Sequence, residues 1–219
     1  MFKNMIAKAP YLKVAVLFCL VLIASIAFGS LADEVHEGDT LNIDTSILKS
    51  INAHATPFLD DFFVIVTQFG GVLGVAAIAL GIASILVLRK RYAKVTFFAM
   101  SMGGALLLNI CLKYIFERAR PDIWNQLVTE TSFSFPSGHA MASAALAISV
   151  AYILWRKGIR SILAVGAALY ILLIGFSRLY LGVHYPTDIL AGWLVSSAWV
   201  ALLILVFHKW LRRVSPRTN

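Results

Sequence analysis

The chain has 219 residues, of which 60% are hydrophobic and 14% are charged, with 19 Lys and Arg against 11 Asp and Glu. Soluble domains carry about 25% charged residues, so this composition excludes an ordinary soluble enzyme and a disordered chain. Two Cys residues are too few for a disulfide-stapled secreted domain, which leaves an integral membrane protein.

Six segments are apolar enough to cross a bilayer, whose hydrocarbon core needs roughly 17–25 helical residues. The predicted spans are residues 12–32, 62–88, 93–116, 137–156, 160–181 and 186–208, with longer loops at 32–57 and 117–137. Helices are expected because a backbone in lipid must satisfy its own hydrogen bonds. The sequence therefore predicts an all-α integral membrane protein, with residues 1–219 forming one domain of six transmembrane helices.

Charged residues separate the two sides of this predicted bundle. One set of connections carries only basic residues, and all 11 acidic residues fall on the other side. The basic set is Lys3, Lys8, Lys13, Arg89, Lys90, Arg91, Lys94, Arg156, Lys157, Arg160, Lys209, Arg212, Arg213 and Arg217. The positive-inside rule makes this side cytoplasmic, together with both chain termini. The basic excess thus indicates topology, and no aromatic-interleaved basic patch suggests a nucleic-acid partner.

The first apolar segment has a second interpretation. Lysines, an apolar stretch and Ser30-Leu31-Ala32 resemble a secretory signal peptide with small residues before its cleavage site. The apolar stretch is longer than the usual core of about 7–15 residues, so we expect it to be retained as a membrane anchor. Cleavage would leave the other five spans oriented as before, and both interpretations stay open.

Four basic residues on the acidic side lie at the outer ends of the third and fifth spans: Lys113, Arg118, Arg120 and Arg178. Ionisable groups at such depth are costly and usually serve a site or a partner. Cations that converge on one face repel one another unless an anion lies among them. For Arg118, pairing with Asp122 or Glu117 explains the position equally well.

Two histidines accompany these cations. His139 follows Ser137 and Gly138 at the start of the fourth span, where the free amides of a helix N-terminus favour an anion. Gly138 allows a ligand to approach the backbone closely. His184 precedes Asp188 by four residues, so the carboxylate can orient the imidazole. Cations, oriented amides and two histidines at one depth predict chemistry at a phosphoryl group.

The arrangement Lys113-x6-Arg120-Pro121, Pro136-Ser137-Gly138-His139 and Ser177-Arg178-x5-His184-x3-Asp188 resembles the signature of the type 2 phosphatidic acid phosphatase superfamily. The resemblance is to its membrane branch of lipid phosphate phosphatases, which includes undecaprenyl pyrophosphate phosphatases and phosphatidylglycerophosphatases of the B type. All three parts occur in the order and spacing of the family, over about a third of the chain.

The resemblance implies a role for each matching residue. His184 is similar to the nucleophile that forms a phosphohistidine, Asp188 to its relay partner, and His139 to the general acid and later the base. The implied phosphate ligands are Lys113, Arg120, Arg178, Ser137 and Gly138, with Arg118 as an auxiliary contact. The family mechanism uses no metal and no cofactor.

The leading hypothesis is a metal-independent phosphatase in the cell (inner) membrane that removes the terminal phosphate of undecaprenyl pyrophosphate or a phospholipid phosphate. Its active site would face the periplasm or the exterior, and its partners would be the bilayer and the lipid substrate, with no obligatory protein partner. Alternatives in the same chemistry are a phosphatidylglycerophosphate or phosphatidic acid phosphatase and a lipid A phosphatase or phosphotransferase. A transporter of an anionic lipid or solute is a more distant alternative.

Overall fold

A computed structural model describes residues 2–156 and 158–214, with side-chain surroundings for residues 12, 14–156 and 158–207. Within these ranges the chain is all-helical and has no strand, which confirms the predicted class. The helices are α1 (Phe2–Glu37), α2 (Leu41–Asn52), α3 (Pro57–Gln68), α4 (Val72–Leu88), α5 (Tyr92–Phe116), α6 (Gly138–Leu154), α7 (Arg160–Tyr180) and α8 (Pro186–Val214).

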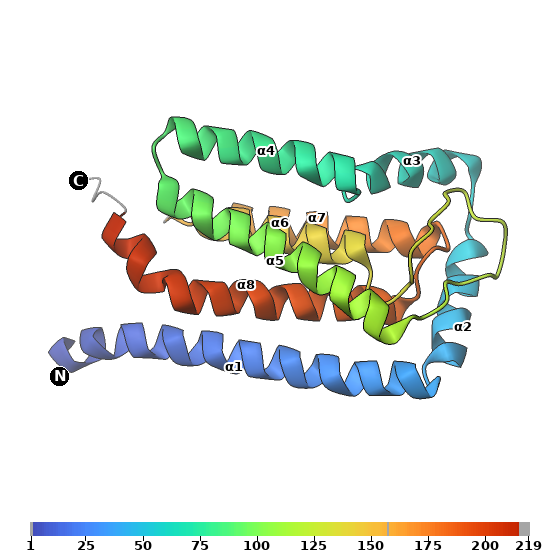
Figure 1. Ribbon diagram of the computed structural model, residues 1–219, viewed down its shortest axis with the longest axis horizontal. Coiled ribbons are helices and arrows are strands. Elements are labelled where there is room, and N and C mark those ends of the chain that lie inside the picture. The colour runs from blue at the N-terminus through green and yellow to red at the C-terminus, as the bar shows by residue number, and fades with distance from the viewer. Residues whose placement is uncertain (1, 157, 215–219) are drawn as a thin grey trace.

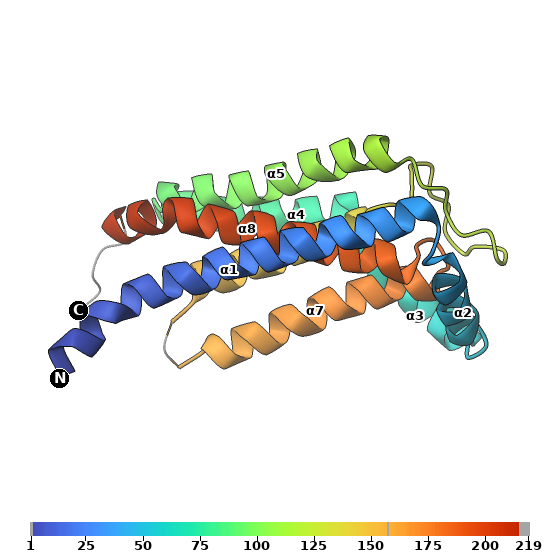
Figure 2. The same ribbon diagram turned by 90° about the horizontal axis from the view of Figure 1, so that it is seen from below.

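The long helices run side by side along the molecule, and α2 lies across one end of the bundle (Figures 1 and 2). Helix α6 packs against α5, α7 and α8, while α1 packs along α8. Most buried positions of α6 are Ala or Ser, including Ala140, Ala144 and Ala145. Small side chains let neighbouring helices approach closely, which matters in a bilayer because lipid supplies little hydrophobic drive for helix association.

The outer helices present apolar side chains away from the bundle. Ile23 and Ile26 of α1 and Ile162 and Leu169 of α7 are all more than 60% exposed. In water such a surface would be unfavourable, whereas in a bilayer it faces hydrocarbon. The exposure pattern therefore fits the membrane protein that the composition predicts.

The expected span at 62–88 is a bent pair of helices. Helix α3 begins at Pro57, with the Thr56 hydroxyl accepting from the Leu59 N–H at 3.3 Å. Helix α4 follows the Gly70-Gly71 pair, and the two axes differ by 47°. The bend places Gly70 beside Ile174 of α7, and both Gly70 and Gly71 beside His139 of α6. The expected loop at 32–57 is largely helical too, because α1 continues to Glu37 and α2 follows.

Four helical segments of the described chain are long and apolar enough to cross a membrane: Val14–Glu37, Tyr92–Phe116, Arg160–Tyr180 and Pro186–Phe207. The bent pair α3–α4 makes a fifth candidate, and α6 is a shorter apolar helix of 17 residues. The protein is therefore an integral membrane protein. The sixth span, which would be α6, stays a prediction.

The two sides predicted from charge correspond to the two ends of the bundle. The start of α1, the end of α8 and the basic α4–α5 and α6–α7 connections lie at one end (Figure 1). Helix α2, the loop 117–137 and the α7–α8 turn lie at the other. Some residues of the basic set fall outside the described residues (Lys157, Arg217) or outside the described side chains (Lys3, Lys8, Lys13, Lys209, Arg212, Arg213).

Candidate active site

The predicted site residues come from helix ends that meet at the end of the bundle nearest α2. Lys113 lies in the last turn of α5, and Arg120 follows in the irregular loop 117–137. Ser137 caps α6, and Gly138 and His139 open it. Arg178 lies in the last turn of α7, His184 in the α7–α8 turn, and Asp188 in the first turn of α8.

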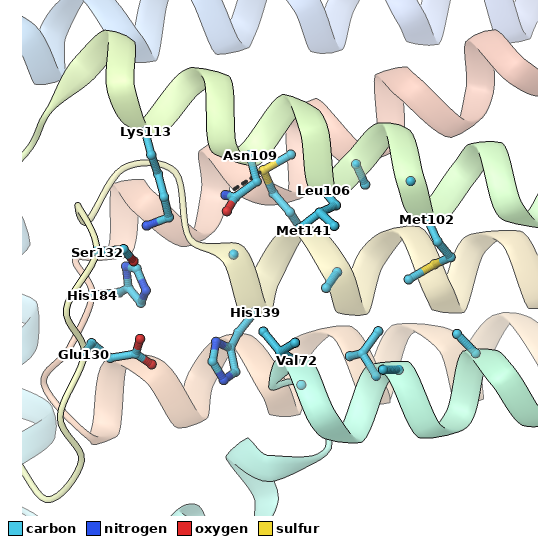
Figure 3. A pocket seen from close by; sticks show the side chains of 18 of the residues that line it. Val72, Met102, Leu106, Asn109, Lys113, Glu130, Ser132, His139, Met141 and His184 are labelled. Atoms are coloured by element: carbon cyan, nitrogen blue, oxygen red, sulfur yellow. Dashed lines mark hydrogen bonds between the residues drawn. The ribbon is translucent and has the colours of Figure 1, made fainter.

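Five of these residues line one cavity of about 370 Å³: Lys113, Arg120, Gly138, His139 and His184. Figure 3 shows Lys113, Glu130, Ser132 and His184 gathered at its polar end, with His139 next to them. Ser137, Arg178 and Asp188 lie behind this lining and hold the residues that form it. Arg118 does not line the cavity and instead binds Asp188 from the far side.

His184 is held with its Nε2 lone pair facing the cavity. Arg120 Nη1 lies 3.2 Å from Nε2, and because a guanidinium only donates, Nε2 must be the acceptor. The proton therefore lies on Nδ1, which donates to Asp188 Oδ2 at 3.1 Å. Burial lowers the pKa of His184 to about 3, against the opposing effect of Asp188. The neutral, Nδ1-protonated ring is the form that can attack an electrophile.

Asp188 is fully buried and accepts hydrogen bonds from several donors. Arg118 Nη1 donates to Oδ1 at 2.6 Å, while the Tyr185 N–H donates to Oδ2 at 2.9 Å. The Ser134 hydroxyl also donates to Oδ2, in addition to the His184 ring. A carboxylate with this set of donors is fixed in orientation, and it fixes the histidine in turn.

His139 lies against the break between α3 and α4. A Cβ atom added to Gly71 would lie 3.3 Å from His139 Nε2, and one added to Gly70 would lie 2.3 Å from an Ile174 methyl. Glycines at the break thus leave the imidazole room to face the cavity. Gly138 is also needed for space, since a Cβ there would lie 3.1 Å from Asn109 Oδ1. Asn109 Nδ2 in turn donates to the Pro136 carbonyl at 3.0 Å and holds the approach to α6.

The three cationic side chains among the predicted phosphate ligands each bind groups of the protein. Lys113 Nζ donates to the Phe133 carbonyl, and Arg120 Nε donates to the Ser132 carbonyl at 2.7 Å. Arg178 Nη1 donates to Thr67 Oγ1 at 2.6 Å, and its Nη2 pairs with Glu130. Arg178 Nε is buried and has no hydrogen-bond partner. A ligand with several acceptor oxygens would complete this set.

The rest of the cavity is apolar and runs from His139 between α4, α5 and α6. Its lining includes Met102, Gly103 and Leu106 of α5 and Val75 and Ala76 of α4. In Figure 3, Val72, Met102 and Leu106 lie on the side of His139 away from His184. The cavity therefore joins a cationic end to an apolar arm, as an amphiphilic ligand with an anionic head requires.

Sequence reasoning did not identify five polar residues of this site: Asp44, Thr67, Asn109, Glu130 and Ser134. Asp44 and Leu48 are both buried on α2, so their i, i+4 spacing was the available signal. The others lie near predicted residues only through tertiary contacts. In the described part of the chain, no group of three or more His, Cys, Asp or Glu side chains is placed to hold a metal ion.

Known proteins are similar to this chain in sequence. The profile described as "PAP2 superfamily" matches residues 94–212, more than half of the chain. Phosphatidylglycerophosphatase B of Bacillus subtilis is 31% identical over 167 residues, which cover 74% of this chain and 82% of that protein. Undecaprenyl-diphosphatase of Sulfolobus acidocaldarius is 27% identical over 198 residues, which cover 86% of this chain and 87% of that protein.

Solved structures agree with these relatives. The crystal structure of a transmembrane PAP2 type phosphatidylglycerolphosphate phosphatase from Bacillus subtilis superposes with a TM-score of 0.80 at 27% identity. The match covers 91% of this chain and 98% of that one. The crystal structure of Aquifex aeolicus LpxE has a TM-score of 0.62 at 26% identity, covering 74% and 94% of the two chains. The chain belongs to the PAP2 superfamily.

Proposed function

We propose that this chain is a lipid phosphate phosphatase that hydrolyses the terminal phosphate of an isoprenoid pyrophosphate or a phospholipid phosphate through a phosphohistidine. The observation that carries the proposal is the orientation of the His184 ring, whose unprotonated Nε2 faces the cationic end of the cavity. The other arm of this cavity is apolar. Apolar lining beside a cationic end favours a lipid substrate over a soluble phosphate ester.

The proposed reaction assigns one role to each side chain. His184 Nε2 attacks phosphorus, and protonated His139 donates a proton to the leaving oxygen. Lys113 and Arg120 bind the phosphoryl oxygens, and Arg178 joins them when the phosphate displaces Glu130 from it. Together they stabilise the charge of the transition state, the task that a metal ion performs in other phosphatases. The mechanism is therefore proposed to need no metal.

The α6 N-terminus completes the proposed phosphate site. The amides of its first turn have no partner within the helix and carry the positive end of its dipole. Ser137 fixes the position of this helix end relative to α8, because its N–H donates to the Asp188 backbone carbonyl at 3.1 Å and its hydroxyl accepts from the Ala140 N–H at 3.4 Å. After the first transfer, neutral His139 would activate the water that hydrolyses the phosphohistidine.

We further propose six spans, formed by α1, α3–α4, α5, α6, α7 and α8, in a single domain of the cell membrane. With the basic end cytoplasmic, the site lies at the outer face, toward a periplasm or the exterior. The favoured substrate is undecaprenyl pyrophosphate, because a substrate at the outer leaflet can enter sideways and the relatives include an undecaprenyl-diphosphatase. Phosphatidylglycerol phosphate is the second candidate, since other relatives bear that name.

The test is phosphate release by purified wild type, His184→Ala and His54→Ala in EDTA. The substrate panel is undecaprenyl pyrophosphate, phosphatidylglycerol phosphate, phosphatidic acid and lipid A. Activity of wild type and of His54→Ala, whose histidine is exposed outside the cavity, together with an inactive His184→Ala, supports the proposal. Full activity of His184→Ala, or an absolute requirement for a metal, would refute the mechanism. A phosphorylated acceptor lipid found by mass spectrometry would show that the phosphoryl group is transferred to a lipid rather than to water.

A further inference from the structure

Two aspartates share one arginine behind His184, on the side away from the cavity. Arg118 Nη1 donates to Asp188 Oδ1 at 2.6 Å, and Arg118 Nη2 donates to Asp44 Oδ2 at 2.8 Å. Thr187 joins them, since its N–H donates to Asp44 Oδ1 at 3.1 Å and its hydroxyl donates to Asp44 Oδ2 at 2.6 Å. We call Asp44, Arg118 and Asp188 the shared-arginine cluster.

The two carboxylates of the shared-arginine cluster are buried, and its guanidinium is largely covered. The side chains of Asp44 and Asp188 are 1% and 0% exposed, and that of Arg118 is 12% exposed. The Arg118 guanidinium carbon lies 4.1 Å from the centroid of the Tyr185 ring, which covers it. Charges interact more strongly in such a place than in bulk water. The charge balance of this cluster therefore acts on any charge that develops at His184.

The cluster is one positive charge short while the imidazole is neutral, because two carboxylates face one guanidinium. Leaving a buried charge without compensation is costly, and reactive sites are where such arrangements occur. In the proposed reaction His184 becomes cationic when Nε2 bonds to phosphorus and Nδ1 keeps its proton. The reaction itself thus supplies the missing positive charge. The other nearby cations, Lys113, Arg120 and Arg178, belong to the phosphate side of the ring.

We propose that Asp44 is a positioning residue for phosphoryl transfer, which holds Arg118 and offsets its charge so that Asp188 remains available to the cationic ring of His184. This inference rests on the proposed function. In the step, the Nε2 lone pair forms the N–P bond, and the bond from phosphorus to the leaving oxygen breaks with its electron pair on that oxygen. Protonated His139 gives that oxygen a proton, and the Nδ1 proton stays hydrogen-bonded to Asp188.

A purely structural role of Asp44 would be to anchor α2 to the first turn of α8 through Thr187. The two roles differ in what they predict. An anchor affects stability and depends on the Thr187 hydroxyl. A role in compensating the charge of Arg118 affects the chemical step and requires a negative charge at residue 44. This role becomes unnecessary when Arg118 is replaced by a neutral residue.

The experiment uses the full chain in detergent with the lipid substrate on which wild type is most active. For Asp44→Asn we expect kcat to fall by about 10- to 100-fold while KM stays within about twofold. The inhibition constant of inorganic phosphate stays within the same limit, because ground-state binding is unchanged. That of orthovanadate, which imitates the covalent transition state, rises by about the factor that kcat loses.

The double variant Asp44→Asn, Arg118→Gln separates the two roles. With residues 44 and 118 both neutral, Asp188 carries one uncompensated negative charge, which is the charge balance of the wild-type cluster. The kcat of the double variant is therefore expected to rise above that of Asp44→Asn alone. An anchor would make the double variant worse, and that result overturns the proposal. Asp60→Asn is the matched control, since Asp60 accepts a hydrogen bond from Tyr180 at 2.6 Å outside the cluster, and it keeps the kcat of wild type.

Further outcomes distinguish this inference from the proposed function. A wild type inactive on every lipid phosphate refutes the proposed function and this inference with it. An active wild type, an inactive His184→Ala and an Asp44→Asn with unchanged kcat overturn this inference alone. If Asp44→Asn does not fold, Thr187→Val decides, because it removes the hydroxyl without changing charge. A kcat within about threefold of wild type supports the charge role, and a loss above about tenfold overturns it.

Discussion

Replacing Glu130 by Gln is expected to tighten the binding of inorganic phosphate. The Glu130 carboxylate pairs with Arg178 and lies 3.7 Å from Arg120 Nη2, measured to Oε2. Both arginines are proposed phosphate ligands, and Glu130 lines the cavity beside His184. The carboxylate therefore occupies a position that a phosphate must take, and the phosphate has to displace it.

The size of the effect follows from the pair that is broken. A hydrogen bond to a charged group contributes about 1.5–3 kcal/mol. The Glu130 side chain is 25% exposed while that of Arg178 is 1% exposed, so water screens part of this energy. We take about 1–2 kcal/mol for the competition, which corresponds to a roughly 5- to 30-fold lower inhibition constant for phosphate.

The assay is product inhibition of lipid phosphate hydrolysis by inorganic phosphate, at fixed pH and ionic strength. Glu117→Gln is the matched control, because it makes the same change of charge in the same loop at an exposed residue outside the cavity. Its inhibition constant is expected to equal that of wild type. An unchanged or higher constant for Glu130→Gln would show that Glu130 orients the arginines for phosphate rather than competing with it, and would refute the reasoning.

Three further predictions concern the two histidines and the apolar arm. Gly71→Ala places a Cβ 3.3 Å from His139 Nε2, so the single-turnover rate of phosphohistidine formation from a lipid phosphate falls about tenfold, while that from p-nitrophenyl phosphate, whose leaving group needs no proton, is unaffected. Because the pKa of His184 is lowered to about 3, its ring stays neutral in the folded protein at about pH 5, as ring ¹⁵N shifts would report. The unfolded chain binds the extra proton below about pH 6.5, so folding stability falls as pH falls from there toward 3. Gly103→Leu fills open space in the apolar arm and raises KM for long-chain substrates but not for short-chain ones.

Gly81 provides the control for both glycine variants. It lies on the exposed side of α4, and a Cβ there meets nothing within 4 Å, so Gly81→Ala and Gly81→Leu keep the activity of wild type. An equal loss in the rate of phosphohistidine formation from both substrates in Gly71→Ala would contradict the acid role given to His139. A protonated His184 at about pH 5, or a Gly103→Leu variant equally active on all chain lengths, would contradict the other two predictions.

The meeting of Lys113, Arg120, His139 and His184 around one cavity could be predicted from the sequence. Hydropathy places each of them at the end of a predicted span, and the alternation of basic and acidic connections places those ends together. Helix ends are fixed by local signals, so a position next to one can be located without tertiary information. The roles of these residues stay predictions until the variants are assayed.

Other features depend on contacts that no local pattern encodes. Asp44 meets Thr187 across 143 positions of the chain, and the segment containing Asp44 was expected to be part of a loop. Glu130 lies in an irregular loop whose path is fixed by tertiary contacts such as the Ser134 N–H to the Arg118 carbonyl at 2.8 Å. The bend at Gly70-Gly71 was missed because the apolar run continues through it, and hydropathy does not measure direction.

The small side chains of α6 have a consequence for how this protein tolerates mutation. Ala140 and Ala145 are 0% exposed, on a helix that packs against α4, α5, α7 and α8. Nearly every replacement there adds volume to a side chain that is fully enclosed by other side chains, and overpacking is destabilising. By contrast, Ile23 and Ile162 face outward, where one apolar residue can replace another at little cost. Sequence drift is therefore expected to concentrate on the rim of the bundle, while the buried positions of α6 change least, including those far from the first turn that touches the reaction.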